Sequence, residues 1–486
     1  MNLKRKKHQN QSKHFYQFPV LKKNTAIIFV HLFKVAANQI QNMKKRNSFT
    51  NKLFTKVIPV DENSKIKLKL VFENFSWLLG DKILKLSLGM VTTVLIARYL
   101  GPSDFGLLNY SIAFVSIISV ISSLGLDQII VRKLVLFPND KHEIIGTAFF
   151  LRIVGSILLI TLSILLISII RPGDTLSLLL IAAISIGTAF QSLDVIDFWF
   201  QANLKSKYTV YAKNISFVTI SILRILLIIL DASIITFAIA ILLENILSGL
   251  LLISTYVYSK EKLLSWRIKI SKAKELLKES WPLILSSLAI MFYMRIDQIM
   301  LKELVGDKSV GIYSAAVRLA EVWYFIPMTI VSSVFPVIVE TKQQDEALYY
   351  RRMAKLYAVM TWIGIVIALF TTFFSGYIID ILYGNQYAGA EEILALNIWA
   401  GIFVFQGVAR GAWLINENLQ KYSFYYTAGA CLLNVVMNFI LIPIMQGKGA
   451  AIATITSYGF SVLVIPLFIK KTRESSIQLF KSFIWR

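Results

Sequence analysis

ARYLGPSDFGLLNY (residues 97–110) lies between two long apolar stretches of the chain. It places an arginine, a Gly-Pro pair, an aspartate and a second glycine in a region that is otherwise apolar. Glycine adopts backbone conformations that a helix does not use, and proline cannot continue a helix. The stretch therefore predicts a corner between two helices, with Gly101-Pro102 ending the first helix and Gly106 at the start of the second.

The composition around this corner is that of a membrane protein. The chain has 486 residues, of which 56% are hydrophobic and 16% charged, whereas about a quarter of the residues of a soluble domain are charged. Many apolar runs reach the ~20 residues that a helix needs to cross a bilayer. We therefore expect an all-α polytopic membrane protein.

Apolar runs bounded by Gly, Pro, Asn or charge predict twelve transmembrane helices. The loops on one predicted side hold most of the Lys and Arg residues between the spans, and those on the other side hold only Arg171, Lys308 and Lys448. The positive-inside rule then places both termini in the cytoplasm. The predicted spans are 75–99, 105–126, 144–170, 175–200, 208–230, 233–258, 280–304, 309–339, 353–382, 391–416, 421–444 and 449–469.

The charge pattern also predicts the domain organisation. The net charge of +23 is concentrated near the N-terminus. Because the basic segments adjoin membrane spans, anionic lipid headgroups are expected as their partners rather than nucleic acid. The predicted parts are a basic N-terminal extension, disordered or on the membrane surface (1–70), a six-helix bundle (75–258), a cytoplasmic amphipathic linker (259–279), a second six-helix bundle (280–469) and a basic cytoplasmic tail (470–486).

Two short sequence echoes indicate an internal repeat. YLGPSDFGLLNYSIA (99–113) resembles LVGDKSVGIYSAAVR (304–318), which pairs Gly101 with Gly306 and Gly106 with Gly311. FQANLKSKY (200–208) resembles INENLQKY (415–422) with one gap, so that Asn203 matches Asn418. Each pair is six predicted helices apart. An even number of crossings gives a parallel 6+6 repeat, and in transporters substrate then binds between the halves during alternating access.

The candidate site residues are a subset of the ionisable residues within the predicted spans, because a charge in the membrane usually faces a cavity or a partner. The basic ones outnumber the acidic ones, which favours an anionic cargo. Helical spacing places several on common faces. The alternative is that they form internal ion pairs or extend to the membrane interface. The ionisable residues within these spans are Lys82, Lys85, Arg98, Arg152, Arg224, Arg295, Lys302, Arg318 and Arg410, and Asp81, Asp194, Asp197, Glu244, Asp297 and Glu321.

Several function classes lack their motifs. The sequence has no Walker A, HExxH or GxSxG pattern, and its four histidines lie outside the predicted membrane core. Cys431 is the single cysteine, so neither an internal disulfide nor a CxxC metal site is possible. We therefore expect no enzyme activity, no bound metal and no cofactor other than a coupling ion, H⁺ or Na⁺.

Longer stretches resemble a known family. The segment ARYLGPSDFGLLNY carries the most specific similarity, and DVIDFWFQANLKSKYTVYAKN, SWPLILSSLAIMFYMRIDQIMLKELVGDKSVGIYSAAVRLAEVWYFIP and NIWAGIFVFQGVARGAWLINENL extend it. Together they resemble bacterial polysaccharide flippases, the O-antigen and exopolysaccharide (Wzx-like) transporters of the MATE/MOP exporter superfamily. The resemblance covers residues 75–470.

The resemblance implies two six-helix bundles around a central cavity in the inner (cytoplasmic) membrane. It implies ATP-independent flipping of undecaprenyl-pyrophosphate-linked oligosaccharides to the outer leaflet, with a polysaccharide polymerase and other export components as partners. The residues expected to bind pyrophosphate are Arg295, Arg318, Lys82, Lys85 and Arg98. The candidates for ion coupling or ion pairing are Asp81, Asp194, Asp197, Asp297 and Glu321.

Two other functions remain as alternatives at this point. A multidrug/cation antiporter of the same superfamily is expected to prefer acidic and aromatic cavity residues, and the basic excess argues against it. A membrane polysaccharide polymerase or ligase usually has a large external loop, which the predicted topology lacks.

Overall fold

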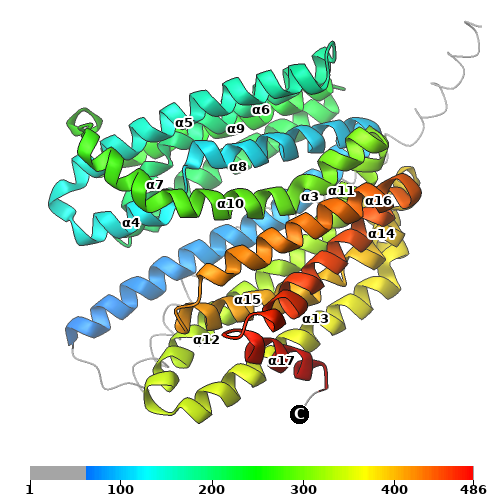
Figure 1. Cartoon of the computed structure of the whole chain (residues 1–486). Coiled ribbons are helices and arrows are strands. Elements are labelled where there is room, and N and C mark those ends of the chain that lie inside the picture. Colours follow the sequence, from blue (N-terminus) through cyan, green and yellow to red (C-terminus); the bar gives the residue numbers. More distant parts are fainter. Residues whose placement is uncertain (1–61, 485–486) are drawn as a thin grey trace, which may run out of the picture. The chain divides into compact units, whose positions relative to one another are not determined.

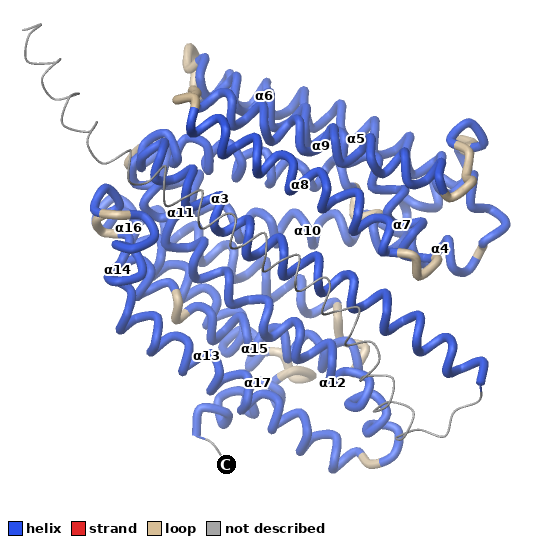
Figure 2. Tube along the Cα trace, turned by 180° about the vertical axis from the view of Figure 1, so that it is seen from behind, coloured by secondary structure: helices blue, strands red, loops and turns tan. Residues whose placement is uncertain are grey.

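The structure is a computed structural model that describes residues 62–484, and every regular element in this range is helical (Figures 1 and 2). The predicted N-terminal extension (1–70) lies largely outside the described residues. The first half comprises α3 (Glu62–Ser123), α4 (Asp127–Leu136), η2 (Pro138–Asp140), α5 (Lys141–Ile170), α6 (Thr175–Ala189), η3 (Phe190–Asp194), α7 (Val195–Ala202), α8 (Ser206–Ile229) and α9 (Ile234–Tyr258).

The second half follows a short linker that contains η4 (Leu263–Ser265). It comprises α10 (Ile270–Leu304), α11 (Asp307–Glu321), η5 (Val322–Tyr324), α12 (Phe325–Gln344), α13 (Glu346–Tyr383), η6 (Asn385–Tyr387), α14 (Ala390–Asn397), α15 (Ala400–Asn416) and α16 (Lys421–Gly459). The chain then forms η7 (Phe460–Val464), η8 (Ile465–Phe468), α17 (Arg473–Lys481) and η9 (Ser482–Ile484).

Ten helical segments of the described chain are long and apolar enough to cross a membrane. Two of them, Ser76–Leu136 and Lys421–Phe468, each contain two predicted spans. A non-helical residue separates the spans, Gly101 (φ 73°, ψ 172°) in the first and Gln446 (φ 50°, ψ −128°) in the second. Each of the twelve predicted spans therefore has a helical counterpart, and the predicted all-α polytopic fold is confirmed.

The corner at Gly101 differs slightly from the predicted one. Gly101 supplies the positive φ that breaks the helix, but Pro102 already lies inside the next helical stretch. Proline is favoured in the first turn of a helix because its missing N–H has no intrahelical acceptor there. Gly306 has the equivalent place before α11, also with positive φ (122°). The predicted pairing of Gly101 with Gly306 thus has a structural basis.

The second echo is a helix-ending turn that recurs with the same backbone hydrogen bonds. The N–H of Lys205 donates to the carbonyl of Phe200 (2.8 Å), and that of Leu419 donates to Leu414 (2.8 Å). Leu204 has φ 54° and Asn418 has φ 57°. Structurally, Leu204 and not Asn203 therefore corresponds to Asn418. The one-residue gap in the sequence match disappears because turn geometry, rather than side-chain identity, is repeated.

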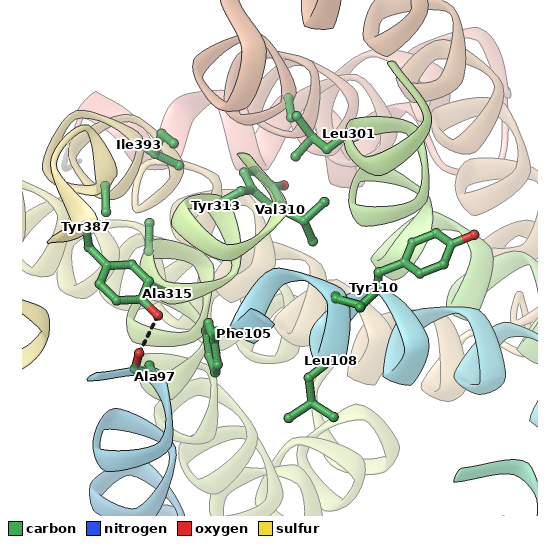
Figure 3. Packing of buried hydrophobic residues seen from close by; sticks show 14 of the residues in the cluster. Ala97, Phe105, Leu108, Tyr110, Leu301, Val310, Tyr313, Ala315, Tyr387 and Ile393 are labelled. Carbon is green, nitrogen blue, oxygen red and sulfur yellow. Dashed lines mark hydrogen bonds between the residues drawn. The ribbon is translucent and has the colours of Figure 1, made fainter. Parts of the chain in front are cut away.

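The described chain belongs to two compact units, one containing residues up to Leu84 together with Ile229–Asp231, the other containing Lys85–Ile228 and Ala232 onward. The second unit holds the main apolar core. At one end of this core the two halves meet, with Phe105 and Tyr110 of α3 close to Val310 and Tyr313 of α11 (Figure 3). Each half also has one apolar cluster of its own. That of the first half lies around Phe200 and Tyr256, and that of the second half lies around Tyr357 and Trp413.

The C-terminal segment packs into the second half. Thr472, Ser475 and Ser476 are buried, and α17 lies beside α13 in both views (Figures 1 and 2). The hydroxyls of Tyr357 and Ser475 are 3.1 Å apart, and those of Thr361 and Ser482 are 2.7 Å apart. Hydroxyl contacts of this kind fix the segment against α13.

Candidate functional site

The first feature of the site is a close contact between α3 and α11 within the second unit. A Cβ added to Gly106 would lie 1.9 Å from the carbonyl oxygen of Asp307, and one added to Gly311 would lie 1.9 Å from that of Pro102. Only glycine lets two helix backbones come so close. The glycines of the repeated motif therefore join the two halves at the corner that the topology prediction places outside.

Arg98 also contributes to this junction. Its Nε donates to the carbonyl of Leu382 (2.7 Å) and its Nη2 to that of Ile381, both in the last turn of α13. Tyr387 donates its hydroxyl to the carbonyl of Ala97 (2.8 Å), as Figure 3 shows. A guanidinium at a helix C-terminus is favourable because the last carbonyls lack intrahelical donors. The role of Arg98 in binding pyrophosphate stays a prediction.

A second contact closes the same end. Arg171, which follows α5, binds Glu303 of α10 through two parallel hydrogen bonds of 3.0 and 3.1 Å. Tyr110 donates its hydroxyl to Glu303 (3.0 Å), and the Arg171 guanidinium lies 5.7 Å from the Tyr110 ring. Bidentate pairs are strong and specific in geometry. Arg171 and Glu303 come from different halves, so their separation is required if the halves move apart here.

Basic residues from both halves gather in the middle of the second unit. Arg318 of α11 lies within electrostatic reach of Arg295 of α10 and Arg224 of α8. Glu244 binds Arg224 (2.7 Å), and Glu321 approaches Arg295 (3.9 Å). Three guanidinium groups thus face two carboxylates, which leaves a positive excess. The side chain of Arg318 is exposed, as a guanidinium that receives a cargo must be.

A polar pocket of about 170 Å³ adjoins this cluster in the first half. It shares Glu244 with the arginine cluster, and its wall combines charged, amide and hydroxyl groups with two phenylalanine rings. Such a mixture is unusual in a membrane-spanning region, where polar groups normally need partners. The lining residues are Lys85, Phe190, Gln191, Asp194, Lys213, Ser216, Phe217, Glu244, Asn245, Ser248, Gly249 and Leu252.

The predicted acids of the first half bind a lysine. Lys213 of α8 contacts Asp194 (3.0 Å) and Asp197 (2.7 Å), and Gln201 donates to Asp197 (3.1 Å). Asp194 and Asp197, which the predicted span 175–200 places on one continuous helix, lie instead on η3 and α7, because the chain tightens into a 3₁₀ turn at Phe190–Asp194. These carboxylates are therefore paired within their own half.

Asp297 is the centre of a buried polar cluster in the second half. Its side chain accepts hydrogen bonds from Tyr313 (2.6 Å), Thr454 (2.7 Å) and Asn438 (2.6 Å), and the residue is 5% exposed. Asn438 also donates to the Oδ1 of Asn434 (3.0 Å). Within the described residues the Oδ1 of Asn438 has no hydrogen-bond donor, although it is buried. The cluster thus presents a carboxylate and amide oxygens, which are ligands suited to a hard cation.

The predicted residues are thus distributed over several places. Arg295, Arg318 and Glu321 meet, Asp194 and Lys85 line the pocket, and Asp297 and Arg98 lie apart from them. Asp81 and Lys82 belong to the other compact unit, and their roles stay predictions. Arg224 and Glu244 were recognised as intramembrane charges but not chosen as site residues. Lys213, Asn434, Asn438 and Thr454 were missed, although lysine and paired asparagines within predicted spans were a usable signal.

Comparison with known proteins places this geometry in context. The family model described as "Polysaccharide biosynthesis protein" matches residues 71–342, and the MatE model matches residues 282–440. The "Capsular polysaccharide biosynthesis protein CapF" of Staphylococcus aureus is 23% identical over 81% of this chain and 97% of its own length. The "Probable low-salt glycan biosynthesis flippase Agl15" of Haloferax volcanii is 23% identical over 46% of this chain and 48% of its own.

Solved structures share the fold. The lipid II flippase MurJ, in an inward closed conformation, has a TM-score of 0.67 at 18% identity, covering 83% of this chain and 91% of that one. An inward-facing multidrug resistance MATE transporter of the MOP superfamily also has a TM-score of 0.67, at 14% identity, covering 82% and 95%. The predicted resemblance to polysaccharide biosynthesis proteins is confirmed by the family model, and the fold is that of the MurJ and MATE structures. The chain belongs to the polysaccharide biosynthesis protein family.

Proposed function

We propose that this protein moves a lipid-linked oligosaccharide, carried on undecaprenyl pyrophosphate, from the cytoplasmic to the outer leaflet of the cell membrane for surface polysaccharide synthesis. The observation that carries the proposal is the arginine cluster of Arg224, Arg295 and Arg318, to which both halves contribute. A diphosphate is the most strongly charged part of such a cargo. It needs a cationic site within the membrane during transfer.

Arginine suits this task. Its guanidinium stays charged at any physiological pH and offers a planar fork of donors that matches phosphate oxygens. The carboxylates of Glu244 and Glu321 neutralise part of the cluster while no cargo is bound. We infer that the diphosphate displaces these carboxylates from the arginines.

The adjoining pocket is our candidate for the first sugar. Amide and carboxylate groups such as Gln191, Asn245 and Asp194 hydrogen-bond to hydroxyls, and the Phe190 and Phe217 rings offer apolar faces. The lipid tail stays in the bilayer while the headgroup crosses. Only the diphosphate and the sugars therefore need a polar path through the protein. A polysaccharide polymerase that consumes the flipped unit is the expected partner.

Alternating access fits the closed end of the second unit. The contacts of Gly106 with α11, Arg98 with α13 and Arg171 with Glu303 hold the two halves together there. We propose that they separate to release cargo and re-form for the next cycle. No Walker motif is present in the sequence, so an ion gradient is the proposed energy source. The Asp297 cluster is the proposed site for that ion, H⁺ or Na⁺.

The test is transport by purified protein in liposomes. A fluorescent undecaprenyl-pyrophosphate oligosaccharide is reconstituted, and a membrane-impermeant reagent reports how much reaches the accessible leaflet. We expect Arg224→Gln, Arg295→Gln and Arg318→Gln each to reduce the rate at least tenfold, and Lys274→Gln, at an exposed position of α10, to leave it unchanged. A cationic dye serves as the alternative cargo. Unaltered glycan transport in all three variants would contradict the arginine site, and transport of the dye but not of the glycan by the parent protein would instead support a multidrug antiporter.

A further inference from the structure

A buried arginine that the proposed function does not use lies in α15. Arg410 is 2% exposed and lies within two turns of the end of that helix at Asn416. Its guanidinium carbon is 5.9 Å from the centre of the Tyr426 ring, and Tyr357 lies within electrostatic reach. These two tyrosines belong to α16 and α13, whereas the arginine cluster is built on α8, α10 and α11. The residue is therefore separate from the arginine cluster of the transport site.

The guanidinium has no hydrogen-bond acceptor in the part of the chain that the structure describes. Its Nε, Nη1 and Nη2 are all buried and all lack a partner among residues 62–484. The acid that caps α15, Glu417, is bound instead by Lys342 (2.9 Å) and Tyr349 (2.9 Å). One aromatic ring compensates only part of a buried positive charge. Five donors thus remain for a group that the described residues do not supply.

The charge itself cannot be avoided by deprotonation. Arginine keeps its proton in proteins, unlike a buried lysine or carboxyl group. A buried charge without a counter-charge is among the most destabilising features that a fold can contain. An anion is the kind of group that supplies both the missing acceptors and the missing counter-charge.

The C-terminal segment covers this region. Gln406 lies one helical turn before Arg410 and donates to Thr361 (2.8 Å), whose hydroxyl contacts that of Ser482 (2.7 Å). Tyr357, beside Arg410, contacts Ser475 of α17 (3.1 Å). The hydroxyls of Ser476 and Ser482 are buried and donate to backbone carbonyls, those of Leu463 and Leu479. The arginine and the C-terminal segment thus share one polar layer.

We propose that Arg410 forms a second anion site, enclosed by α17, which takes a small inorganic anion such as chloride or phosphate. The anion neutralises the guanidinium and strengthens the packing of the C-terminal segment against α13 and α15. This site is structural or regulatory, and it does not depend on the cargo of the transporter. Its failure would leave the proposed function intact.

Anion-dependent thermal stability tests the site. The full chain in detergent is unfolded at constant ionic strength and pH in sodium gluconate, with chloride or phosphate replacing gluconate. We expect chloride or phosphate to raise the unfolding temperature by about 3 °C at about a hundred times its Kd. Arg410→Met should abolish this rise, Arg410→Lys should keep part of it, and Arg351→Gln, at an exposed position of α13, should keep all of it.

A second measurement locates the effect. Limited proteolysis of the C-terminal segment should slow when the anion is added to the parent protein, but not when it is added to Arg410→Met. If neither anion stabilises the parent protein relative to gluconate, or if Arg410→Met responds as strongly as the parent, the proposal is wrong. Because Arg410→Met removes a buried charge, it is expected to fold, and its stability in gluconate provides the reference.

Discussion

Gly106 and Gly311 approach each other's helices reciprocally: the Cα of Gly106 faces the carbonyl of Asp307, and that of Gly311 faces the carbonyl of Pro102. The two glycines are equivalent in the sequence repeat, and so are Pro102 and Asp307. A reciprocal contact of equivalent residues is what a twofold axis produces. The axis of the internal repeat therefore passes close to this crossing, and the corner motif is part of the contact between the halves.

Gly106→Ala and Gly311→Ala should each weaken this contact. The added methyl group would lie 1.9 Å from a backbone oxygen in both cases, so the helices must separate, at a cost of about 1–3 kcal/mol. We expect lower thermal stability in detergent and slower glycan transport. Gly376→Ala is the matched control, because a Cβ at that helical position meets nothing within 4 Å. Equal behaviour of all three variants would contradict a close helix crossing.

The helical fold is predictable from the sequence because a chain that crosses a membrane must satisfy its backbone hydrogen bonds within each span. The site is predictable only in part. The length of the apolar runs predicts the spans. Gly101 predicts the corner between two of them because few other residues adopt its positive φ. The partners of Arg98 are backbone carbonyls of Ile381 and Leu382, which leave no side-chain signature. Lys213 was missed because its acids, Asp194 and Asp197, lie on other elements. Pairing across elements is decided by tertiary packing, which helical spacing does not report.

The Arg171–Glu303 pair should hold the two halves together in one conformation. Its side chains are 23% and 34% exposed and its geometry is bidentate, so we expect a coupling free energy of about 1–2 kcal/mol in a double-mutant cycle of Arg171→Gln and Glu303→Gln. The single variants should also open this end. Labelling of Val310→Cys, a fully buried position at this end, in a Cys431→Ser background measures that opening. If the two substitutions have additive effects on the free energy of unfolding and leave the labelling rate unaltered, the pair does not hold the halves together.

Asp297→Asn should uncouple transport from the ion gradient. The substitution keeps the size of the side chain but removes the charge that a cation needs, while Tyr313 and Thr454 can still donate to the remaining oxygen. In liposomes, glycan transport by the parent protein should respond to an imposed Na⁺ or H⁺ gradient, and that of Asp297→Asn should not. Asp380→Asn, at an exposed position of α13, is the control. A gradient response that survives in Asp297→Asn would place the coupling ion elsewhere.

Lys213→Met should destabilise the first half strongly. It leaves Asp194 and Asp197 without their shared cation (3.0 and 2.7 Å) in a half-buried setting, and breaking a buried ion pair from one side costs about 3 kcal/mol or more. Replacing all three residues as Lys213→Met, Asp194→Asn and Asp197→Asn should recover most of that stability, because no charge then remains unpaired. The unfolding temperature in detergent measures both. If the triple variant is no more stable than Lys213→Met, the loss does not arise from unpaired acids.

Asp174 should make the stability of the loop before α6 dependent on pH. Burial tends to raise the pKa of its carboxyl. Hydrogen bonds from the N–H (3.0 Å) and hydroxyl (2.7 Å) of Ser177, together with the charges of Lys302 and Arg171, outweigh that effect, so the pKa lies below its usual value of 3.8. A carboxyl with a lowered pKa in the folded state stabilises that state above the unfolded pKa, and the contribution disappears as the pH falls through the folded pKa. Asp174→Ala should therefore cost about 1 kcal/mol at neutral pH and progressively less below pH 3.8. Asp174→Asn, which retains a capping oxygen, should lose less at neutral pH and show no such pH dependence. Thermal unfolding of the three proteins across this range measures the difference, and a constant gap between the parent and Asp174→Ala at every pH would contradict an ionised cap.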